Sequence, residues 1–250
     1  MPSLNSFEPG LRAVVVGASG GIGRALTLAL AADPAVDRVL ALSRQAVGLD
    51  QAAVQSAGLD AADEASVERA AKVTRDRLGD IDLVLVAIGV LQDEARGIRP
   101  ERTWRAIEPE PMLEVFQTNT VGPALIAKHF LPLLARDRKS VLAALSARVG
   151  SIADNRLGGW HSYRASKAAL NMLIRCFAIE LARRNPSALC VGLHPGTVDT
   201  ALSAPFQANV TAGRLFEPAT AAGHLLGVID RLEPGDSGGV FAWDGERIPA

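Results

Sequence analysis

The stretch that decides the fold is Ala13-Val14-Val15-Val16-Gly17-Ala18-Ser19-Gly20-Gly21-Ile22-Gly23-Arg24, in which a cluster of glycines joins an apolar run to an Ala- and Leu-rich segment. A short β-branched run is typical of a strand buried on both faces, and the segment that follows has helical periodicity. Glycine is required where the backbone turns tightly and where a side chain would collide with a pyrophosphate. The order of strand, glycine turn and helix therefore predicts a dinucleotide site, rather than a plain tight turn, at Gly17, Ser19, Gly20, Gly21, Ile22 and Gly23.

The same alternation of strand and helix continues along the chain. Further apolar runs lie at 38–42, 83–87, 141–145, 189–193 and 240–243, and segments with helical periodicity lie at 22–32, 65–78, 112–135 and 165–184. This alternation predicts a doubly wound α/β fold of the Rossmann type, with a parallel, seven-stranded sheet between two layers of helices. The irregular stretches 91–111, 150–161 and 197–218 each follow a strand, so the function is expected there, with 199–218 acting as a lid over a substrate.

Composition and charge exclude several classes of protein. The 250 residues include 26 Lys plus Arg and 27 Asp plus Glu, so the net charge is −1, and no nucleic-acid-binding surface is predicted. An apolar content of 48% excludes general disorder and fits one domain over residues 1–250. The chain lacks the pattern of a signal peptide or membrane span, which predicts a cytoplasmic protein with reduced thiols at Cys176 and Cys190. The four histidines lack metal-ligand spacing, so no metal site is expected.

The end of the second apolar run indicates which dinucleotide is bound. Sites specific for NAD usually place a carboxylate here to bind the adenosine ribose, whereas this chain has Ser43 and Arg44. Arg44 can pair with a 2′-phosphate and Ser43 can add a hydrogen bond, so NADP(H) is favoured over NAD(H); a solvated arginine is the alternative. Asp60 is positioned either to accept a hydrogen bond from the adenine amino group or to cap its own loop.

Tyr163 and Lys167 lie four residues apart, on one face of the predicted helix. A phenol titrates near pH 10, which is too high for easy proton exchange at neutral pH. An ammonium about 4.5 Å away, at an effective dielectric constant near 20, stabilises phenolate by roughly 3 to 4 kcal/mol, or two to three pKa units. The pair therefore predicts a general acid and base at Tyr163, the only tyrosine of the chain.

Together these motifs resemble those of the classical short-chain dehydrogenases and reductases over essentially the whole chain. The matching residues are Gly17-x-x-x-Gly21-x-Gly23, Asn119, Tyr163-x-x-x-Lys167 and Pro195-Gly196. Arg148-Val149-Gly150-Ser151-Ile152, Gly158-Gly159-Trp160 and Lys128-His129-Phe130-Leu131-Pro132 resemble the subgroup of C-factor-like and sniffer-like carbonyl reductases. The resemblance implies NADP(H)-dependent interconversion of a small-molecule carbonyl and an alcohol by a homodimer or homotetramer.

The resemblance also implies residue roles. Lys167 is expected to bind the nicotinamide ribose, and Asn119 to interrupt its helix and hold a water that leads from Lys167 to solvent. Further coenzyme contacts are expected at Ala61, Ala87, Ile88, Gly89, Pro195, Gly196, Thr197, Val198 and Thr200.

The family places a serine after the fifth strand to hold the substrate carbonyl, where this chain has Ser146 followed by Ala147. Ser146 is expected in that role and Ser151 is the fallback; alternatively, Ser146 takes the first position of the family's usual serine pair and Ala147 takes the working one. A nucleotide-binding signalling protein of the C-factor type is the main alternative function. An extended epimerase fits less well, because only about 55 residues follow Pro195.

Overall fold

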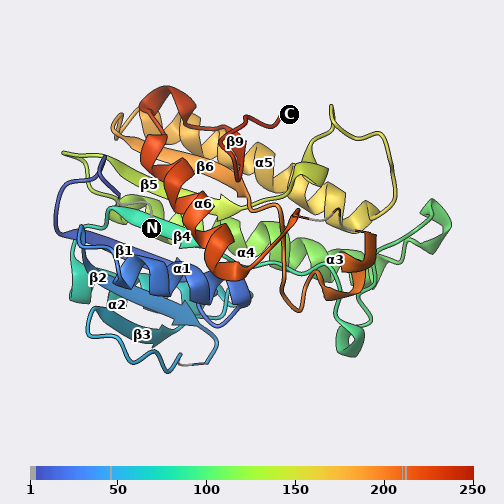
Figure 1. Cartoon of the computed structure of the whole chain (residues 1–250), viewed down its shortest axis with the longest axis horizontal. Helices are drawn as coiled ribbons and strands as arrows, with labels where there is room; N and C mark the ends of the chain where they lie inside the picture. Colours follow the sequence, from blue (N-terminus) through green and yellow to red (C-terminus); the bar gives the residue numbers. More distant parts are fainter. Residues whose placement is uncertain (1–3, 46, 210, 212) are drawn as a thin grey trace.

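A computed structural model describes residues 4–45, 47–209, 211 and 213–250 (Figure 1). Its main sheet has seven strands in the order β3-β2-β1-β4-β5-β6-β9, and every neighbouring pair is parallel. This confirms the predicted doubly wound α/β fold. The strands are β1 (Leu11–Val16), β2 (Val36–Ser43), β3 (Val54–Gly58), β4 (Leu83–Val86), β5 (Ser140–Leu145), β6 (Ala188–His194) and β9 (Val240–Ala242).

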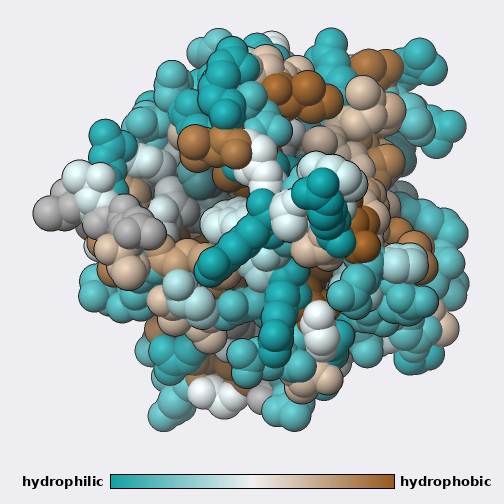
Figure 2. Space-filling view, turned by 90° about the vertical axis from the view of Figure 1, so that its right-hand side faces the viewer, coloured by the Kyte–Doolittle hydropathy of each residue, from teal (hydrophilic) through white to brown (hydrophobic). Residues whose placement is uncertain are grey.

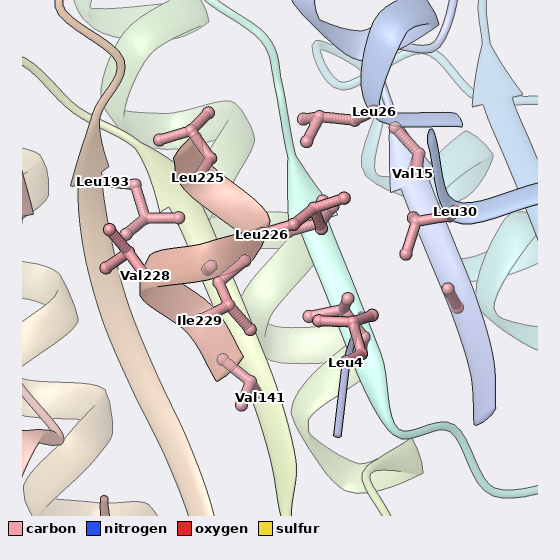
Figure 3. Packing of buried hydrophobic residues seen from close by; sticks show 14 of the residues in the cluster. Leu4, Val15, Leu26, Leu30, Val141, Leu193, Leu225, Leu226, Val228 and Ile229 are labelled. Carbon is pink, nitrogen blue, oxygen red and sulfur yellow. The ribbon is translucent and has the colours of Figure 1, made fainter. Parts of the chain in front are cut away.

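Helices cover both faces of the sheet. One face carries α1 (Gly21–Ala31) and α6 (Pro218–Arg231), and the other carries α2 (Glu64–Leu78), α4 (Gly122–Phe130) and α5 (His161–Ala182). The two layers exist because neighbouring residues of each buried strand point to opposite faces. In β1, for example, Val15 packs with α1 and α6, whereas Val14 packs with the opposite layer. Figure 3 shows the first of these cores, with Leu225, Leu226 and Ile229 of α6 among its packed side chains.

Shorter elements complete the chain. Helix α3 (Pro109–Phe116) precedes α4, and strand β7 (Thr197–Val198) pairs with β8 (Leu215–Phe216) in a separate sheet. Short 3-10 helices are η1 (Glu94–Arg96), η2 (Trp104–Ala106), η4 (Leu131–Leu133), η5 (Arg148–Gly150), η6 (Ala204–Asn209) and η7 (Pro234–Asp236). Among the described residues, no helix is both long and apolar enough to cross a membrane.

Three features differ from the runs expected from sequence. Strand β3 was not among them, because this edge strand contains Gln55 and Ser56 and lacks a continuous apolar run. Helix α6 was also absent from the expected segments, although Pro218 occupies its first turn. The expected helix over 112–135 is divided by a π-helical turn, η3 (Gln117–Val121), which contains Asn119.

The parallel strands place their carboxyl ends at one edge, on the right of Figure 1, where α3 and the long loops gather. Figure 2 views the molecule from that side, and long hydrophilic side chains cross its centre with hydrophobic ones gathered above. Ligands bind at this edge in open α/β sheets. The fold therefore brings the three irregular stretches to the edge where a site is expected.

Candidate functional site

A cleft of about 440 Å³ lies at the carboxyl edge, between the glycine turn and the N-terminal part of α5. It is bounded by the ends of β4, β5 and β6 and by the loop that contains Phe206. The cleft brings together fifteen of the residues expected to act on coenzyme or substrate, namely Gly20, Gly21, Ile22, Gly23, Ala87, Ile88, Gly89, Ser146, Tyr163, Lys167, Pro195, Gly196, Thr197, Val198 and Thr200. Seven others do not line it, namely Gly17, Ser19, Ser43, Arg44, Asp60, Ala61 and Asn119.

The glycine turn fits a phosphate group. Gly17 has a φ of 87°, and a Cβ there would lie 2.6 Å from the carbonyl oxygen of Ala87. A Cβ on Gly23 would lie 2.1 Å from the carbonyl oxygen of Gly17, so both positions require glycine. The N-cap of α1 is Gly20, and within the described part of the chain no side chain caps this N-terminus, whose N–H groups and positive dipole end favour an anion. These residues can therefore hold a pyrophosphate, as the sequence predicts.

The residues expected at the adenosine end lie at the carboxyl ends of β2 and β3. Arg44 is exposed and makes no ion pair within the described part of the chain. The Ser43 hydroxyl donates to the carbonyl oxygen of Gln45. Asp60 is exposed, and its carboxylate accepts a hydrogen bond from the Ala62 N–H at 3.0 Å. That bond is the loop cap considered as an alternative role for Asp60, whereas the guanidinium of Arg44 is free for a ligand phosphate.

Tyr163 and Lys167 lie on consecutive turns at the start of α5, and both face the cleft. The Lys167 Nζ lies 5.9 Å from the centroid of the Tyr163 ring and donates a hydrogen bond to the carbonyl oxygen of Leu145 at 2.8 Å. Lys167 is buried and Tyr163 is partly buried. The helix therefore supplies the predicted pairing of a phenol and an amine at one wall of the cleft.

The pKa values of this pair differ from those expected from their spacing. Burial raises the pKa of Tyr163 to about 12, and burial lowers the pKa of Lys167 to about 8. The expected lowering of the phenol pKa is therefore not seen in the protein alone. The physical reason is that desolvation penalises the charged form of both groups, while the ammonium is directed to the Leu145 carbonyl.

Asn119 is fully buried in the π-helical turn, and its amide is saturated by protein groups. Its Oδ1 accepts a hydrogen bond from the Val90 N–H at 2.8 Å, and its Nδ2 donates to the Val90 carbonyl at 2.8 Å and to Ser166 Oγ at 3.1 Å. A Cβ on Gly89 would lie 3.4 Å from Asn119 Oδ1 and 3.6 Å from Lys167 Nζ. Asn119 therefore lies in a turn that interrupts its helix and ties the segment after β4 to α5, whereas the water that the resemblance places beside it stays a prediction.

Neither candidate serine presents a free hydroxyl proton to the cleft. Ser146 Oγ donates to Asn171 Oδ1 on α5 at 2.6 Å, although Ser146 lines the cleft. Ser151 lies outside the lining, and its Oγ accepts a hydrogen bond from the Asp154 N–H at 3.0 Å and donates to the carbonyl oxygen of Ala250 at 3.5 Å. Ala147 lines the cleft directly after Ser146. This arrangement favours the interpretation in which Ala147 takes the working position of the family's serine pair.

His194 also lines the cleft, whereas from sequence it was considered only as a metal ligand. Its Nδ1 is buried and has no hydrogen-bond partner among the described residues, and its burial, together with the nearby positive charge of Arg148, lowers its pKa to about 4. His194 is therefore a neutral imidazole at neutral pH. Its place directly before Pro195-Gly196, at the end of a buried strand, is the signal that could have identified it.

Sequence reasoning did not identify Glu101, which holds the start of the helix that carries Tyr163. It is only 8% exposed, and its carboxylate accepts hydrogen bonds from the Ser162 N–H at 3.2 and 3.3 Å and from the Ser162 hydroxyl. Its carbonyl oxygen also accepts the N–H of Trp160 at 2.6 Å. Helix α5 has no acidic residue in its first turn and no cap from its own N-cap residue. Glu101 therefore caps the helix that carries Tyr163, from a position 61 residues away in sequence.

Among the described residues, no group of three or more His, Cys, Asp or Glu side chains is arranged to hold a metal ion.

Comparison with protein families matches residues 12–211 to the short chain dehydrogenase model. The chain is 33% identical to a 1-hydroxy-2-glutathionyl-2-methyl-3-butene dehydrogenase of Rhodococcus sp., over 90% of this chain and 93% of that protein. It is 37% identical to the C-signal protein of Myxococcus xanthus, over 55% of this chain and 78% of that protein.

Solved structures with the same fold include carbonyl reductases. An NADPH-bound carbonyl reductase from chicken fatty liver matches with a TM-score of 0.82 and 28% identity, covering 97% of this chain and all of that one. The carbonyl reductase Sniffer of D. melanogaster matches with a TM-score of 0.81 and 22% identity over the same shares, which supports the fold. These matches confirm the resemblance on which the expected chemistry depends.

Proposed function

The chain belongs to the short-chain dehydrogenase family of oxidoreductases, and from this membership we propose that it interconverts a carbonyl and an alcohol with NADP(H) as coenzyme. The observation that carries the proposal is the convergence of Tyr163, Lys167 and the glycine turn on one cleft. A proton donor, a cation and a phosphate cradle at one edge of a sheet are the parts that hydride transfer to a carbonyl requires of a protein.

The residues at the cleft fit a dinucleotide. The glycine turn and the uncapped N-terminus of α1 would hold the pyrophosphate, and Lys167 with Thr197 would contact the nicotinamide end. When bound, NADPH supplies the hydride for a carbonyl carbon, and NADP⁺ accepts one from an alcohol. The free guanidinium of Arg44 and the lack of a carboxylate at the end of β2 support a preference for NADP(H).

Tyr163 acts as the proton donor to the carbonyl oxygen in the reduction direction. A phenol with a pKa of about 12 holds its proton at neutral pH but is a weak acid by itself, so proton transfer depends on stabilisation of the phenolate. Lys167, with a pKa of about 8, carries its positive charge at pH 7 and stabilises the phenolate left after proton transfer. Ser146 has a smaller part than expected from the resemblance, because its hydroxyl proton is directed to Asn171.

The segment 199–218 acts as a lid in this proposal. Its ends are fixed where β7 pairs with β8, and Phe206 within it lines the cleft. A loop anchored at both ends with an apolar side chain over the site can exclude water during reaction.

Self-association is proposed through α5, whose outer face exposes Met172 and Ile179 at 64% and 45%.

A C-factor-like signalling role is the second candidate function. Two observations favour it, namely the 37% identity to C-signal and the absence of a serine hydroxyl proton free to polarise a carbonyl in the described cleft. A protein of this kind would bind the dinucleotide with little turnover. The two functions differ in whether the cleft reduces a substrate at an appreciable rate.

Replacing Tyr163 with Phe tests the enzyme directly. NADPH oxidation should be followed with a panel of aldehydes and diketones, and NADPH binding should be measured by fluorescence. We expect turnover by the native protein, a loss of at least about 100-fold in Tyr163→Phe, and a Kd for NADPH within about twofold of the native value. Retained turnover in the variant refutes Tyr163 as the acid, and tight NADPH binding without turnover by the native protein favours the signalling role.

A further inference from the structure

A second cleft of about 980 Å³ lies beside the first and shares two of its walls. Trp160 and Phe206 line both clefts, and their rings pack with centroids 5.0 Å apart. The Trp160 ring also meets Tyr163 edge to face, with centroids 6.3 Å apart. The partition between the two clefts therefore begins one aromatic ring away from the proposed proton donor.

The partition between the two clefts has two parts. Trp160 is held in place by its backbone, and Phe206 belongs to the segment proposed as a lid. Trp160 has a φ of 50°, a left-handed conformation that bulky residues rarely adopt, and its N–H donates to the carbonyl of Glu101. Phe206 lies in η6, inside the segment proposed as a lid. A substituent on the reacting carbon would meet this pair of rings, and movement of Phe206 alone would open a path between the two clefts.

The volume of the first cleft makes such a path useful. Most of its lining consists of the residues proposed to hold the coenzyme, so little of its 440 Å³ is left for a substrate beyond the reacting carbon. The second cleft is the larger of the two and holds none of the coenzyme residues. The remote part of any substrate larger than a simple aldehyde therefore has one adjoining cleft to occupy.

The charges of the second cleft indicate the kind of group it accepts. Glu101 also lines this cleft, but its carboxylate is buried and accepts hydrogen bonds from Ser162. Of the remaining charges, Arg99 and Arg102 supply two positive ones, and Glu94 and Glu108 supply two negative ones. All four side chains are exposed, and none takes part in an ion pair among the residues that the structure describes. An arm of a single sign would meet repulsion as well as attraction here, whereas an arm that carries both signs can satisfy both pairs.

We propose that the second cleft binds the remote arm of the substrate, and that this arm is zwitterionic, with an apolar stem against Trp160 and Phe206 and an ammonium and a carboxylate at its far end. The inference rests on the proposed carbonyl and alcohol chemistry and names the substrate class for it. The apolar side chain of Pro205 in the lining fits the stem, whereas Ile98 is only 1% exposed and adds little surface.

Four ketones that differ only in their para substituent test the proposal. They are 4-acetylphenylalanine, which is zwitterionic, 3-(4-acetylphenyl)propionate, 2-(4-acetylphenyl)ethylamine and 4-ethylacetophenone. Two exposed ion pairs together are worth about one decade of affinity. We therefore expect kcat/KM for the zwitterion to exceed each of the other values by about tenfold, mainly through a lower KM. The proposal is overturned if the four kcat/KM values lie within twofold of one another. It is also overturned if the protein reduces 4-ethylacetophenone and none of the three charged ketones.

Charge variants assign the effect to this cleft. In the double variant Arg99→Ala, Arg102→Ala and in the double variant Glu94→Gln, Glu108→Gln, the advantage of the zwitterion over 4-ethylacetophenone should fall to about threefold or less, with kcat for 4-ethylacetophenone unchanged. Arg69→Ala, which removes an exposed arginine on α2, is the matched control and should keep the tenfold advantage. If the tenfold advantage of the zwitterion over 4-ethylacetophenone persists in both double variants, the inference is overturned. If the native protein reduces none of the four ketones, the proposed function is overturned instead.

Discussion

Replacing Glu101 with Ala should remove the hydrogen bonds that hold the N-terminus of α5, the helix that carries Tyr163. The buried carboxylate accepts hydrogen bonds from the Ser162 N–H and the Ser162 hydroxyl, and it lies at the positive end of the dipole of α5. Hydrogen bonds to a charged group contribute about 1.5 to 3 kcal/mol each, and a lost cap costs about 1 kcal/mol. Because these contributions overlap, we expect the free energy of unfolding to fall by about 2 to 4 kcal/mol.

The same change should affect catalysis more than coenzyme binding. Glu101 fixes the backbone at Trp160 and Ser162, directly before Tyr163, and a misplacement of about 1 Å near the reacting atoms can cost about 100-fold in rate. We expect kcat to fall by about 10- to 100-fold while the KM for NADPH stays within about twofold. Glu101→Gln retains a carbonyl oxygen to accept the Ser162 N–H, so it should restore most of the lost rate.

Thermal and urea unfolding, with steady-state kinetics, measure both effects. A fall of 2 to 4 kcal/mol corresponds to a Tm lower by roughly 5 to 15 °C in a protein of this size. Asp33→Ala is the matched control, because Asp33 is also 8% exposed and accepts the N–H groups of Leu4 and Ala35, at the opposite edge of the sheet. The reasoning is refuted if Glu101→Ala unfolds like the native protein, or if Asp33→Ala costs as much in kcat.

Three further results are expected. Arg44→Asp should weaken NADPH binding far more than NADH binding. An unchanged ratio of the two Kd values would contradict the proposed contact between Arg44 and the 2′-phosphate. His194 has its pKa held near 4, below the ordinary 6.5, so the unfolded chain binds its proton first and stability falls as the pH drops from 6.5 towards 4. Urea unfolding at pH 7 and pH 5 should show a loss of about 2 kcal/mol that is absent in His194→Gln; equal losses would contradict this sign. Ser146→Ala should lower kcat less than tenfold, whereas Ala147→Ser should raise it; a loss of about 100-fold in Ser146→Ala would return the carbonyl contact to Ser146.

Local patterns predicted those parts of the site that depend on neighbours in sequence. The strand, glycine turn and helix around Gly17 needed only the twelve residues from Ala13 to Arg24, and Tyr163 and Lys167 needed only the period of one helix. Strand β3 escaped prediction because an edge strand does not need a continuous apolar run. The cap from Glu101 escaped because no local pattern joins it to Ser162, which is 61 residues away.

The electrostatics of the pair could not be predicted from spacing alone. An estimate at fixed distance treats Lys167 as a free charge directed at the phenol, whereas the fold buries both groups and turns the amine to the Leu145 carbonyl. Ser146 is a similar case, because the sequence shows a serine at the end of a strand but not the amide of Asn171 that takes its proton. Tertiary neighbours decide such details, and sequence reasoning has access to them only through a family resemblance.

The π-helical turn at Gln117–Val121 has a geometric consequence for the molecule. Each residue of an α-helix advances the chain by about 100° around the axis, so the surplus residue of the wider turn rotates α3 by about that amount relative to α4. Deleting one residue here would turn α3, and the loop before it, to another side of the helix axis. The one additional residue of this turn thus sets the rotation of α3 relative to α4. That rotation determines where α3 and the loop before it lie with respect to the site.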